Sequence, residues 1–415
     1  MPRCGICLRL LIVLCLSSPL WGQTRAGEAL SLEQCIALAL ERHPLILSSV
    51  KRHESSLARV RQATVYPYPS VYFNSDLQPR LLDFANSAES YLGVTQTFEL
   101  PRKRALRGKI AERESQQVET SIDLVNLEVI FQVKKSFYEL LLAQEKLKYA
   151  RLDLELTEDY LQNAELKFAT GDVARVEVLR AKVEALKAAN AVRVATSNED
   201  LAKARLNYHL ARRTNAPLQV TGQLQVPFAD LNLEQSRTEA LNLRPELRGL
   251  QFSIEKEIHT QESARLSNWP DLDFDLSRHH LEGEPTSWSF TVSVPLPFLF
   301  RQRQEAEIAE AQASIDALER DSDQMRNTIL LEVEEAYTNA QKARNQILLY
   351  QREILPHAEE VFDMFTFSYQ VGEIGGIELI EARKTLNESR KAYADALLEY
   401  ALALATLDKA VGRRP

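Results

Sequence analysis

The chain has 415 residues, a formal net charge of −8 at pH 7, and 45% hydrophobic and 26% charged residues. The acidic balance gives no support to nucleic-acid binding, which usually needs a basic surface, and the hydrophobic fraction excludes an intrinsically disordered chain. Only 13 glycines and 16 prolines occur. This composition predicts long helices and argues against a loop-rich enzyme.

The N-terminus has the pattern of a secretory signal peptide. Two arginines accompany a short apolar run over 10–16, and small residues suited to cleavage follow it. We predict a signal peptide over 1–26, with cleavage between 22 and 26. Lipid attachment at Cys15 is an alternative, which the large leucine before it disfavours. Removal of the signal leaves Cys35 as the only cysteine, so the exported chain has no internal disulfide.

The rest of the chain consists of two halves with similar sequence patterns. Residues 31–34 (Ser-Leu-Glu-Gln) recur as 232–235 (Asn-Leu-Glu-Gln), and 168–179 match 369–380, each time 201 residues further along. Repeated matches at one offset indicate a duplication. Proline and glycine break the helical pattern between the two copies. The predicted organisation is a first repeat (27–213), a linker (214–231) and a second repeat (232–415).

Each repeat contains one very long predicted helix, over 102–169 and over 301–370. About 68 residues at about 1.5 Å each give about 100 Å, which no compact core spans, so each helix must be a rod packed along others. Pro356 should bend or restart the second rod. Apolar residues in that rod step by four and three residues, as in the seam of a coiled coil (Ile329, Val333, Ala336, Ala340, Ala343, Ile347, Tyr350 and Ile354).

Shorter helices complete each repeat. A first helix is predicted over 31–65, where Ser31 can cap the start and Gln34 completes a capping box. Tight turns at Gly171 and Gly372 should end the long rods. The predicted returning antiparallel helices run over 173–212 and 374–410.

Four segments alternate apolar and polar residues with the period of a β-strand. They cover 69–78, 90–99, 270–280 and 286–296, close to the length that a tilted membrane strand needs. A soluble four-stranded sheet with one buried face fits the alternation equally well. The export signal and the long flanking helices, which offer no core for a small sheet, favour the membrane.

Four strands cannot close a barrel, and open edges in lipid would leave backbone groups unpaired. If the strands span a membrane, several chains must pool them, and three chains would give twelve strands. The polar faces would then line a wet lumen, with Asp271, Asp273 and Asp275 of each chain facing it. A solvated polar face explains these three residues equally well.

Together these features resemble the TolC-like outer membrane efflux proteins, over nearly the whole exported chain. The resemblance rests on the duplicated plan, on Tyr-Pro (68–69) and Trp-Pro (269–270) before strands, and on the hairpin motifs that start at Gly171 and Gly372. The segment 96–107 resembles the heavy-metal efflux branch, with Arg102 where glycine is usual.

The resemblance implies a mostly α fold with a small β part. Three chains would form a twelve-stranded barrel in the outer membrane, continued by an α-helical barrel through the periplasm. It also implies a passive conduit for small solutes, with metal cations as one alternative. The expected partners are two further copies of the chain, outer membrane lipid, a periplasmic adaptor and an inner membrane pump of the resistance–nodulation–division type.

The same resemblance assigns residues at the helix tips. Glu378 and Glu381 fall at the family's aperture carboxylates, and three copies would ring the pore with six charges that favour cations. Glu177 and Tyr369 fall where neighbouring hairpins close the gate. Without the resemblance, a solvated helix face is the simpler interpretation of these glutamates. The expected adaptor-docking tips are Thr170, Gly171, Asp172, Val173, Val371, Gly372, Glu373 and Ile374, the last replacing a basic gate residue.

The sequence contains no P-loop, dinucleotide-binding glycine motif, His-Glu-x-x-His or nucleophile elbow, so no enzyme and no cofactor are expected. No metal site is expected either, because the adjacent His279 and His280 would point to opposite faces of a strand. Two other functions stay open. One is a soluble periplasmic coiled-coil scaffold, and the other is the channel of a type I protein secretion system.

Overall fold

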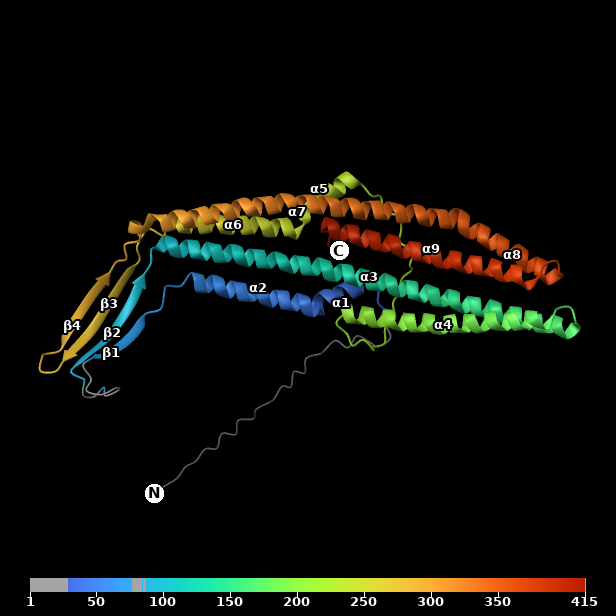
Figure 1. The fold of residues 1–415 in the computed structure, drawn as a ribbon, viewed down its shortest axis with the longest axis horizontal. Helices are drawn as coiled ribbons and strands as arrows, with labels where there is room; N and C mark the ends of the chain where they lie inside the picture. The colour runs from blue at the N-terminus through green and yellow to red at the C-terminus, as the bar shows by residue number, and fades with distance from the viewer. Residues whose placement is uncertain (1–28, 77–83, 85–86, 415) are drawn as a thin grey trace, which may run out of the picture.

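The computed structural model describes residues 29–76, 84 and 87–414, so the predicted signal peptide lies outside the described residues. Figure 1 shows a long rod of helices with a small sheet bent away at one end. The first half contains α1 (Leu32–Arg42), α2 (Pro44–Ala63), β1 (Ser70–Asp76), β2 (Glu89–Phe98), α3 (Pro101–Thr170) and α4 (Arg175–His209). The second half contains α5 (Leu233–Leu243), α6 (Pro245–Arg265), β3 (Leu272–Leu281), β4 (Ser287–Ser293), the 3₁₀ turn η2 (Pro297–Phe300), α7 (Arg301–Leu349), the π-helical turn η3 (Tyr350–Ile354), α8 (Leu355–Val371) and α9 (Gly376–Val411). The prediction of a mostly helical fold with four short strands is confirmed.

The two rods form as predicted, and one of them is interrupted. The 70 residues of α3 give a rod of about 105 Å at about 1.5 Å per residue. In the second half, the π-helical turn η3 separates α7 from α8, and Pro356 lies in the first turn of α8. Proline has no N–H to donate to the preceding turn and its ring crowds a carbonyl there, so the helix widens just before it.

The prediction of one helix over 31–65 is wrong at His43. This residue is extended, with φ −65° and ψ 125°, and it ends α1 while Pro44 begins α2. A residue before proline is pushed out of the α region by the proline ring. Arg244 before Pro245 has the same conformation between α5 and α6. The predicted capping box is present, because Ser31 Oγ accepts from the Gln34 N–H while the Ser31 N–H donates to Gln34 Oε1.

From one edge of the molecule to the other, the helices of the rod follow the same lateral order as the strands of the sheet. The sheet is antiparallel with the order β1-β2-β3-β4. In the rod, α3 packs against α2 and α4 on one side and against α6 and α9 on the other, while α7 packs against α6 and α9. The described part of the chain therefore forms an open array, with edges at β1 and β4 in the sheet and at α2/α4 and α7/α8 in the rod (Figure 1).

The main core lies at mid-length and joins the two repeats. Leu140 of α3, Leu206 of α4 and Tyr400 of α9 are fully buried there. The linker crosses this level, where the Ala229 N–H donates to Tyr400 Oη at 2.9 Å. The C-terminal end of α9 also lies at mid-length (Figure 1). Along α7 the six seam residues from Ile329 to Ile347 are buried as predicted, whereas the two in the π-helical turn are half-buried.

Candidate functional site: the sheet faces and the helix tips

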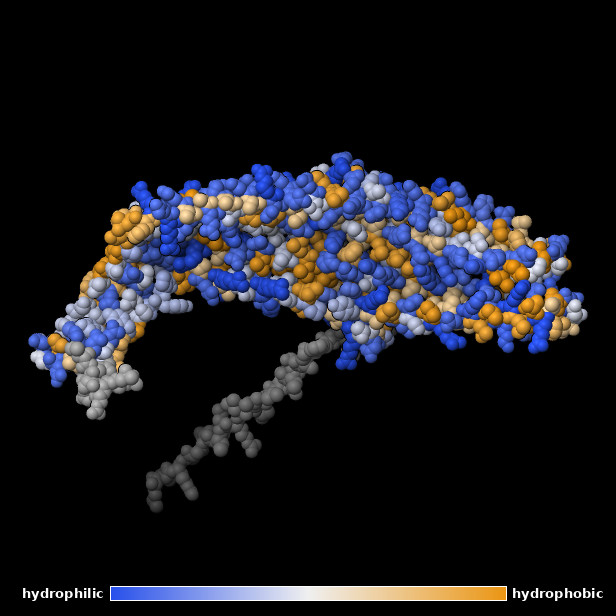
Figure 2. All heavy atoms as spheres, viewed as in Figure 1, coloured by the Kyte–Doolittle hydropathy of each residue, from blue (hydrophilic) through white to orange (hydrophobic). Residues whose placement is uncertain are grey.

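One face of the sheet is apolar and exposed. Val71 is 71% exposed, Trp288 70% and Phe290 65%. Other exposed apolar side chains on the strands are Phe73, Leu92, Val94, Phe98, Leu272, Leu276 and Val292. Figure 2 shows hydrophobic side chains along the sheet and around the start of α7. This face contradicts the alternative of a sheet that buries its apolar side inside its own chain. None of the described helices has a stretch long and apolar enough to cross a membrane.

The opposite face of the sheet is polar and internally hydrogen-bonded. Asp275 accepts from Tyr72 Oη at 2.9 Å and from Thr95 Oγ1 at 2.8 Å. Asp273 accepts from Thr97 Oγ1 at 2.5 Å. Two of the three predicted pore-facing aspartates thus lie on the polar side of β3, held by neighbouring strands. Their position fits a water-filled interior, in which carboxylates keep partners and remain hydrated.

The third aspartate lies where the strands meet the helices. Asp271 accepts from Lys103 Nζ at 2.9 Å, and the same ammonium group donates to the Trp269 carbonyl at 2.7 Å. Nearby, Arg107 pairs with Glu99 at 2.7 Å and also donates to the Val65 carbonyl. These basic residues of the 96–107 motif therefore tie α3 to the ends of α2, β2 and the chain before β3.

A cluster of three polar side chains, Glu89, Tyr91 and His279, lies at the far end of the polar face. It was not predicted from the sequence. His279 Nε2 lies 2.9 Å from Glu89 Oε1, which also accepts from Tyr91 Oη at 2.5 Å. The Tyr91 and His279 rings stack with centroids 4.4 Å apart. β3 continues to Leu281 and contains both histidines of the adjacent pair. His279 and its neighbour lie on opposite faces, as the strand period requires.

The two hairpin turns end the rod together, opposite the sheet (Figure 1). Gly171 has φ +86° and Gly372 has φ +82°, the left-handed conformation that glycine adopts without strain. The Asp172 N–H donates to the Lys167 carbonyl at 2.9 Å, so the last turn is closed in the usual way. The predicted docking turns 170–173 and 371–374 are mostly exposed here, with Val173 and Ile374 half-buried.

Tyr369 joins the two hairpins of one chain. Its side chain is 4% exposed and packs against Tyr160 of α3, with ring centroids 5.5 Å apart. Lys167 Nζ donates to the Tyr369 carbonyl at 2.8 Å. Tyr369 Oη is buried beside the Glu177 carboxylate without a hydrogen bond of normal geometry. Burial and this carboxylate raise the pKa of Tyr369 to about 12, so the phenol stays neutral.

Gly376 makes this packing possible. A Cβ at this position would lie 2.0 Å from Tyr160 Oη and 2.7 Å from Glu177 Oε1. Any larger residue would therefore push the start of α9 away from the first hairpin. The structure thus brings together Glu177 and Tyr369, the two residues that the resemblance placed at the gate, within a single chain.

A buried ion pair network beside this contact was not predicted. Arg383 of α9 donates to Asp153 of α3 and to Glu184 Oε2 of α4, the latter at 3.1 Å. The three side chains are 12%, 13% and 20% exposed. The partners of Arg383 lie 230 and 199 residues away along the chain. No periodic pattern connects such positions, so only the fold reveals them.

Glu378 and Glu381 lie in the first two turns of α9 and are exposed. Within the described residues, neither carboxylate forms a hydrogen bond or an ion pair. Their spacing of three places them on one helix face. Both carboxylates are therefore accessible to solvent in the single chain.

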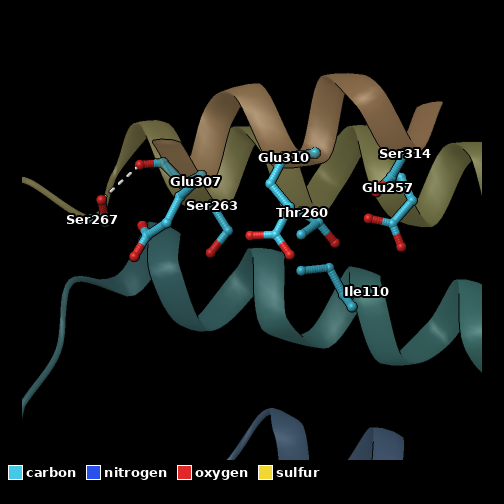
Figure 3. Close-up of a pocket in the computed structure, with 10 residues that line it drawn as sticks. Ile110, Glu257, Thr260, Ser263, Ser267, Glu307, Glu310 and Ser314 are labelled. Atoms are coloured by element: carbon cyan, nitrogen blue, oxygen red, sulfur yellow. Dashed lines mark hydrogen bonds between the residues drawn. The ribbon is translucent and has the colours of Figure 1, made fainter. Parts of the chain in front are cut away.

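A groove of about 340 Å³ lies between α3, α6 and α7 near the sheet. Figure 3 shows Glu307 and Glu310 of α7 extending toward α3, with Glu257 of α6 beside them. Two of these carboxylates already have cationic partners, since Glu257 pairs with Lys256 at 3.1 Å and Glu307 pairs with an arginine of its own helix at 3.0 Å. Over 29–76 and 87–414, no three His, Cys, Asp or Glu residues are placed to hold a metal ion.

Comparison with known families explains this combination of sheet, rod and paired tips. A model of the outer membrane efflux protein family matches residues 35–212 and matches again over 237–413. The chain belongs to the outer membrane efflux protein family. The resemblance inferred from the sequence is confirmed, and this efflux protein is a passive channel component, not an enzyme.

Relatives of the efflux protein cover almost its whole length. The cobalt-zinc-cadmium resistance protein CzcC of Cupriavidus metallidurans is 25% identical over 95% of this chain and 93% of its own. Nodulation protein T of Rhizobium leguminosarum bv. trifolii is 23% identical over 78% of this chain and 73% of its own. The outer-membrane channel OprN has a TM-score of 0.76 at 17% identity, covering 92% of this chain and 89% of OprN. CusC has a TM-score of 0.75 at 16% identity, covering 92% and 91%.

Proposed function

We propose that three copies of this chain form the outer membrane channel of a tripartite efflux system. The strands of three copies close a twelve-stranded barrel in the outer membrane, and the rods close a helical tunnel in the periplasm. The observation that carries this proposal is the exposed apolar face of a sheet whose edge strands, β1 and β4, pair with no further strand among the described residues. In lipid, the edge groups of β1 and β4 must find partners, and only other copies offer the matching strand.

Closure follows from the shared order of strands and helices. β4 of one copy would pair with β1 of the next, and the α7/α8 edge would pack on the α2/α4 edge at the same time. Such head-to-tail contacts form a ring when the rotation between copies closes. Twelve strands then leave a lumen lined by the polar face, which carries Asp273, Asp275 and Glu89 of each copy.

We infer that divalent metal cations are the cargo. Support comes from the acidic polar face, from the unpaired Glu378 and Glu381, and from the full-length similarity to a cobalt-zinc-cadmium resistance protein. The turns 170–173 and 371–374 would dock a periplasmic adaptor, which connects the channel to an inner membrane pump of the resistance–nodulation–division type. The contact of Tyr369 with the first hairpin would hold the tips in their closed arrangement.

The test places one charge on either face of the same strand. Phe290→Arg puts a cation on the apolar face, which costs about 2–4 kcal/mol at the bilayer midplane, so membrane assembly should fail. Ser289→Arg puts the same cation on the polar face and should still assemble. Membrane fractionation and the mass of the detergent-solubilised complex measure both. A water-soluble monomer in the unaltered protein, or equal assembly of the two variants, contradicts the channel.

A further inference from the structure

The short segment that connects β4 to α7 is amphipathic along its length. Phe298, Leu299 and Phe300 are 49%, 65% and 73% exposed, although they are large and apolar. Arg301 and Arg303 follow directly and are exposed as well. We call residues 297–303 the junction segment. Exposed aromatic residues next to arginines are typical of a surface at the boundary between hydrocarbon and water.

Other exposed aromatic residues lie at the same level of the molecule. Tyr68, 88% exposed, precedes β1, and Trp269, 60% exposed, precedes β3. Val294 and Leu296 continue the apolar side of β4 toward the junction segment and are also exposed. Figure 2 shows hydrophobic side chains running from the sheet to the start of α7. The junction segment is thus continuous with the face that the proposed function places in lipid.

The arginines at this level lack strong protein partners. Within the described residues, the side chain of Arg301 forms no ion pair and no hydrogen bond, and the same is true of the side chain of the exposed Arg102 in the first turn of α3. Arg303 pairs with Glu307 at 3.0 Å, but its side chain is 85% exposed, so the pair is weak. By contrast, Lys103 is held by Asp271. Arg102 stands where glycine is usual in the heavy-metal efflux branch. It therefore adds a cation that forms no ion pair within the described residues.

A groove beside the junction segment has both polar and apolar walls. Its volume is about 520 Å³, and it lies between the end of α6 and the start of α7. Phe300 and Pro297 form the apolar wall, and the polar groups come from Ser267, Asn268, Arg303, Gln304 and Glu307. The carboxylate of Glu307 is paired with Arg303. A phospholipid headgroup, together with the first carbon atoms of its acyl chains, fits such a lining better than a purely polar or purely apolar molecule does.

We propose that the junction segment binds the phosphate headgroups of anionic phospholipids in the leaflet nearest the helical rod. Phe298, Leu299 and Phe300 enter the acyl region, while Arg301 and Arg303 bind phosphate and Arg102 adds a third cation at the same level. Each basic residue near an anionic leaflet strengthens binding, and guanidinium groups suit phosphate geometry. This proposal rests on the membrane insertion proposed above.

A second copy of the chain is less suited than lipid to cover the junction segment. The edge that a neighbour would bring to α7 is α2, whose last two turns carry the exposed Arg59 and Arg61. Arg59 is paired with Glu114 at 3.2 Å. The side chain of Arg61 has no ion pair within the described residues, and its cation would repel Arg301 and Arg303. Phosphate groups have the complementary charge, which favours lipid at the outer side of this junction.

The experiment compares lipids that differ only in headgroup charge. The detergent-solubilised trimer is exposed to phosphatidylglycerol or phosphatidylcholine with identical acyl chains, and native mass spectrometry counts the bound lipids. The unaltered protein should prefer phosphatidylglycerol. Arg301→Gln with Arg303→Gln should lower this preference roughly tenfold or more, since two interfacial cations are lost. Arg320→Gln with Arg326→Gln removes the same charge from exposed positions further along α7 and should leave the preference unchanged.

Three results would overturn the proposal. The first is equal retention of the two lipids by the unaltered protein, and the second is an equal loss of headgroup preference in the junction and control variants. Displacement of the lipid by millimolar inorganic phosphate would also count against it, because that outcome marks a general anion site. The mass and conductance of the trimer are measured on the same sample. An intact conducting trimer without headgroup preference defeats this proposal alone, whereas a missing trimer defeats the channel.

Discussion

Arg383 holds three helices together at the end of the rod that carries the two hairpin turns. Its guanidinium group joins α9 to Asp153 of α3 and to Glu184 of α4, where all three side chains are largely buried. Two carboxylates in such a site tolerate each other because the cation lies between them. Removing the cation leaves uncompensated buried charge, which costs more than the ion pairs themselves contribute to stability.

Arg383→Gln should therefore loosen the tips without unfolding the rod. The expected cost is about 3 kcal/mol, confined to the hairpin ends. Hydrogen exchange of 160–184 and 369–383 should accelerate, and the conductance of the trimer in a planar bilayer should rise. Lys187→Gln is the matched control, because Lys187 pairs with the same Glu184 but is 69% exposed. Equal effects of the two variants would mean that the network does not restrain the tips.

At the scale of elements, the break between α1 and α2 places a histidine in the core. His43 is 7% exposed, and its Nδ1 accepts from the Leu45 N–H at 3.3 Å. Burial lowers the pKa of His43 below its ordinary value of 6.5. Burial also lowers the pKa of His209 at the end of α4, and the neighbouring His43 lowers it further. The folded protein keeps both imidazoles neutral at a pH where the unfolded chain takes up protons.

The lower histidine pKa values in the folded state predict that the free energy of unfolding falls as the pH is lowered. At pH above about 6.5 both histidines are neutral in either state, and as the pH falls below that value the unfolded state gains protons first. The midpoint of thermal unfolding should fall between pH 7 and pH 5. His43→Asn keeps a side chain that can cap α2 and should flatten this dependence. His357→Gln alters a histidine that is 79% exposed and should leave it unchanged. A slope that survives in His43→Asn would remove His43 as its source.

Local patterns in the sequence predicted most elements, because periodicity and turn residues act over a few positions. The long rods, the four strands and the turn glycines are all of this kind. The break at His43 was also encoded locally, by the proline after it, but a strong helical pattern on both sides concealed it. Arg383 with its two acids, and Glu89 with His279, depend on chain segments 190 to 230 residues apart. Side-chain pairs of this kind have no period and emerge only with the fold.

At the scale of the whole molecule, an open array becomes a channel only when copies join. Strands and helices keep the same lateral order, so one rotation between neighbours satisfies both edges together. In such a ring, residues that are merely exposed in one chain are repeated three times around an axis. The proposed role of Glu378 and Glu381 in cation selectivity depends on this repetition, because three copies place six carboxylates at one level of the pore, where they attract cations.

Glu378→Gln with Glu381→Gln should lower the preference for cations over anions in planar-bilayer recordings. The physical reason is the loss of six negative charges at the narrowest level of the proposed pore. Glu388→Gln, an exposed change further along α9, should leave the preference unchanged. If the double variant selects ions as the unaltered protein does, the aperture is elsewhere.

The C-terminal end of α9 lies halfway along the rod, beside α5 (Figure 1). Arg413 is anchored there to Glu239 at 2.6 Å, and Arg414 pairs with Asp123. In the proposed channel, a fluorophore or affinity handle attached after Arg414 therefore lies at the waist of the assembly, far from both openings. Energy transfer between such labels on neighbouring copies would report oligomer formation while the mouth and the proposed docking end stay unobstructed.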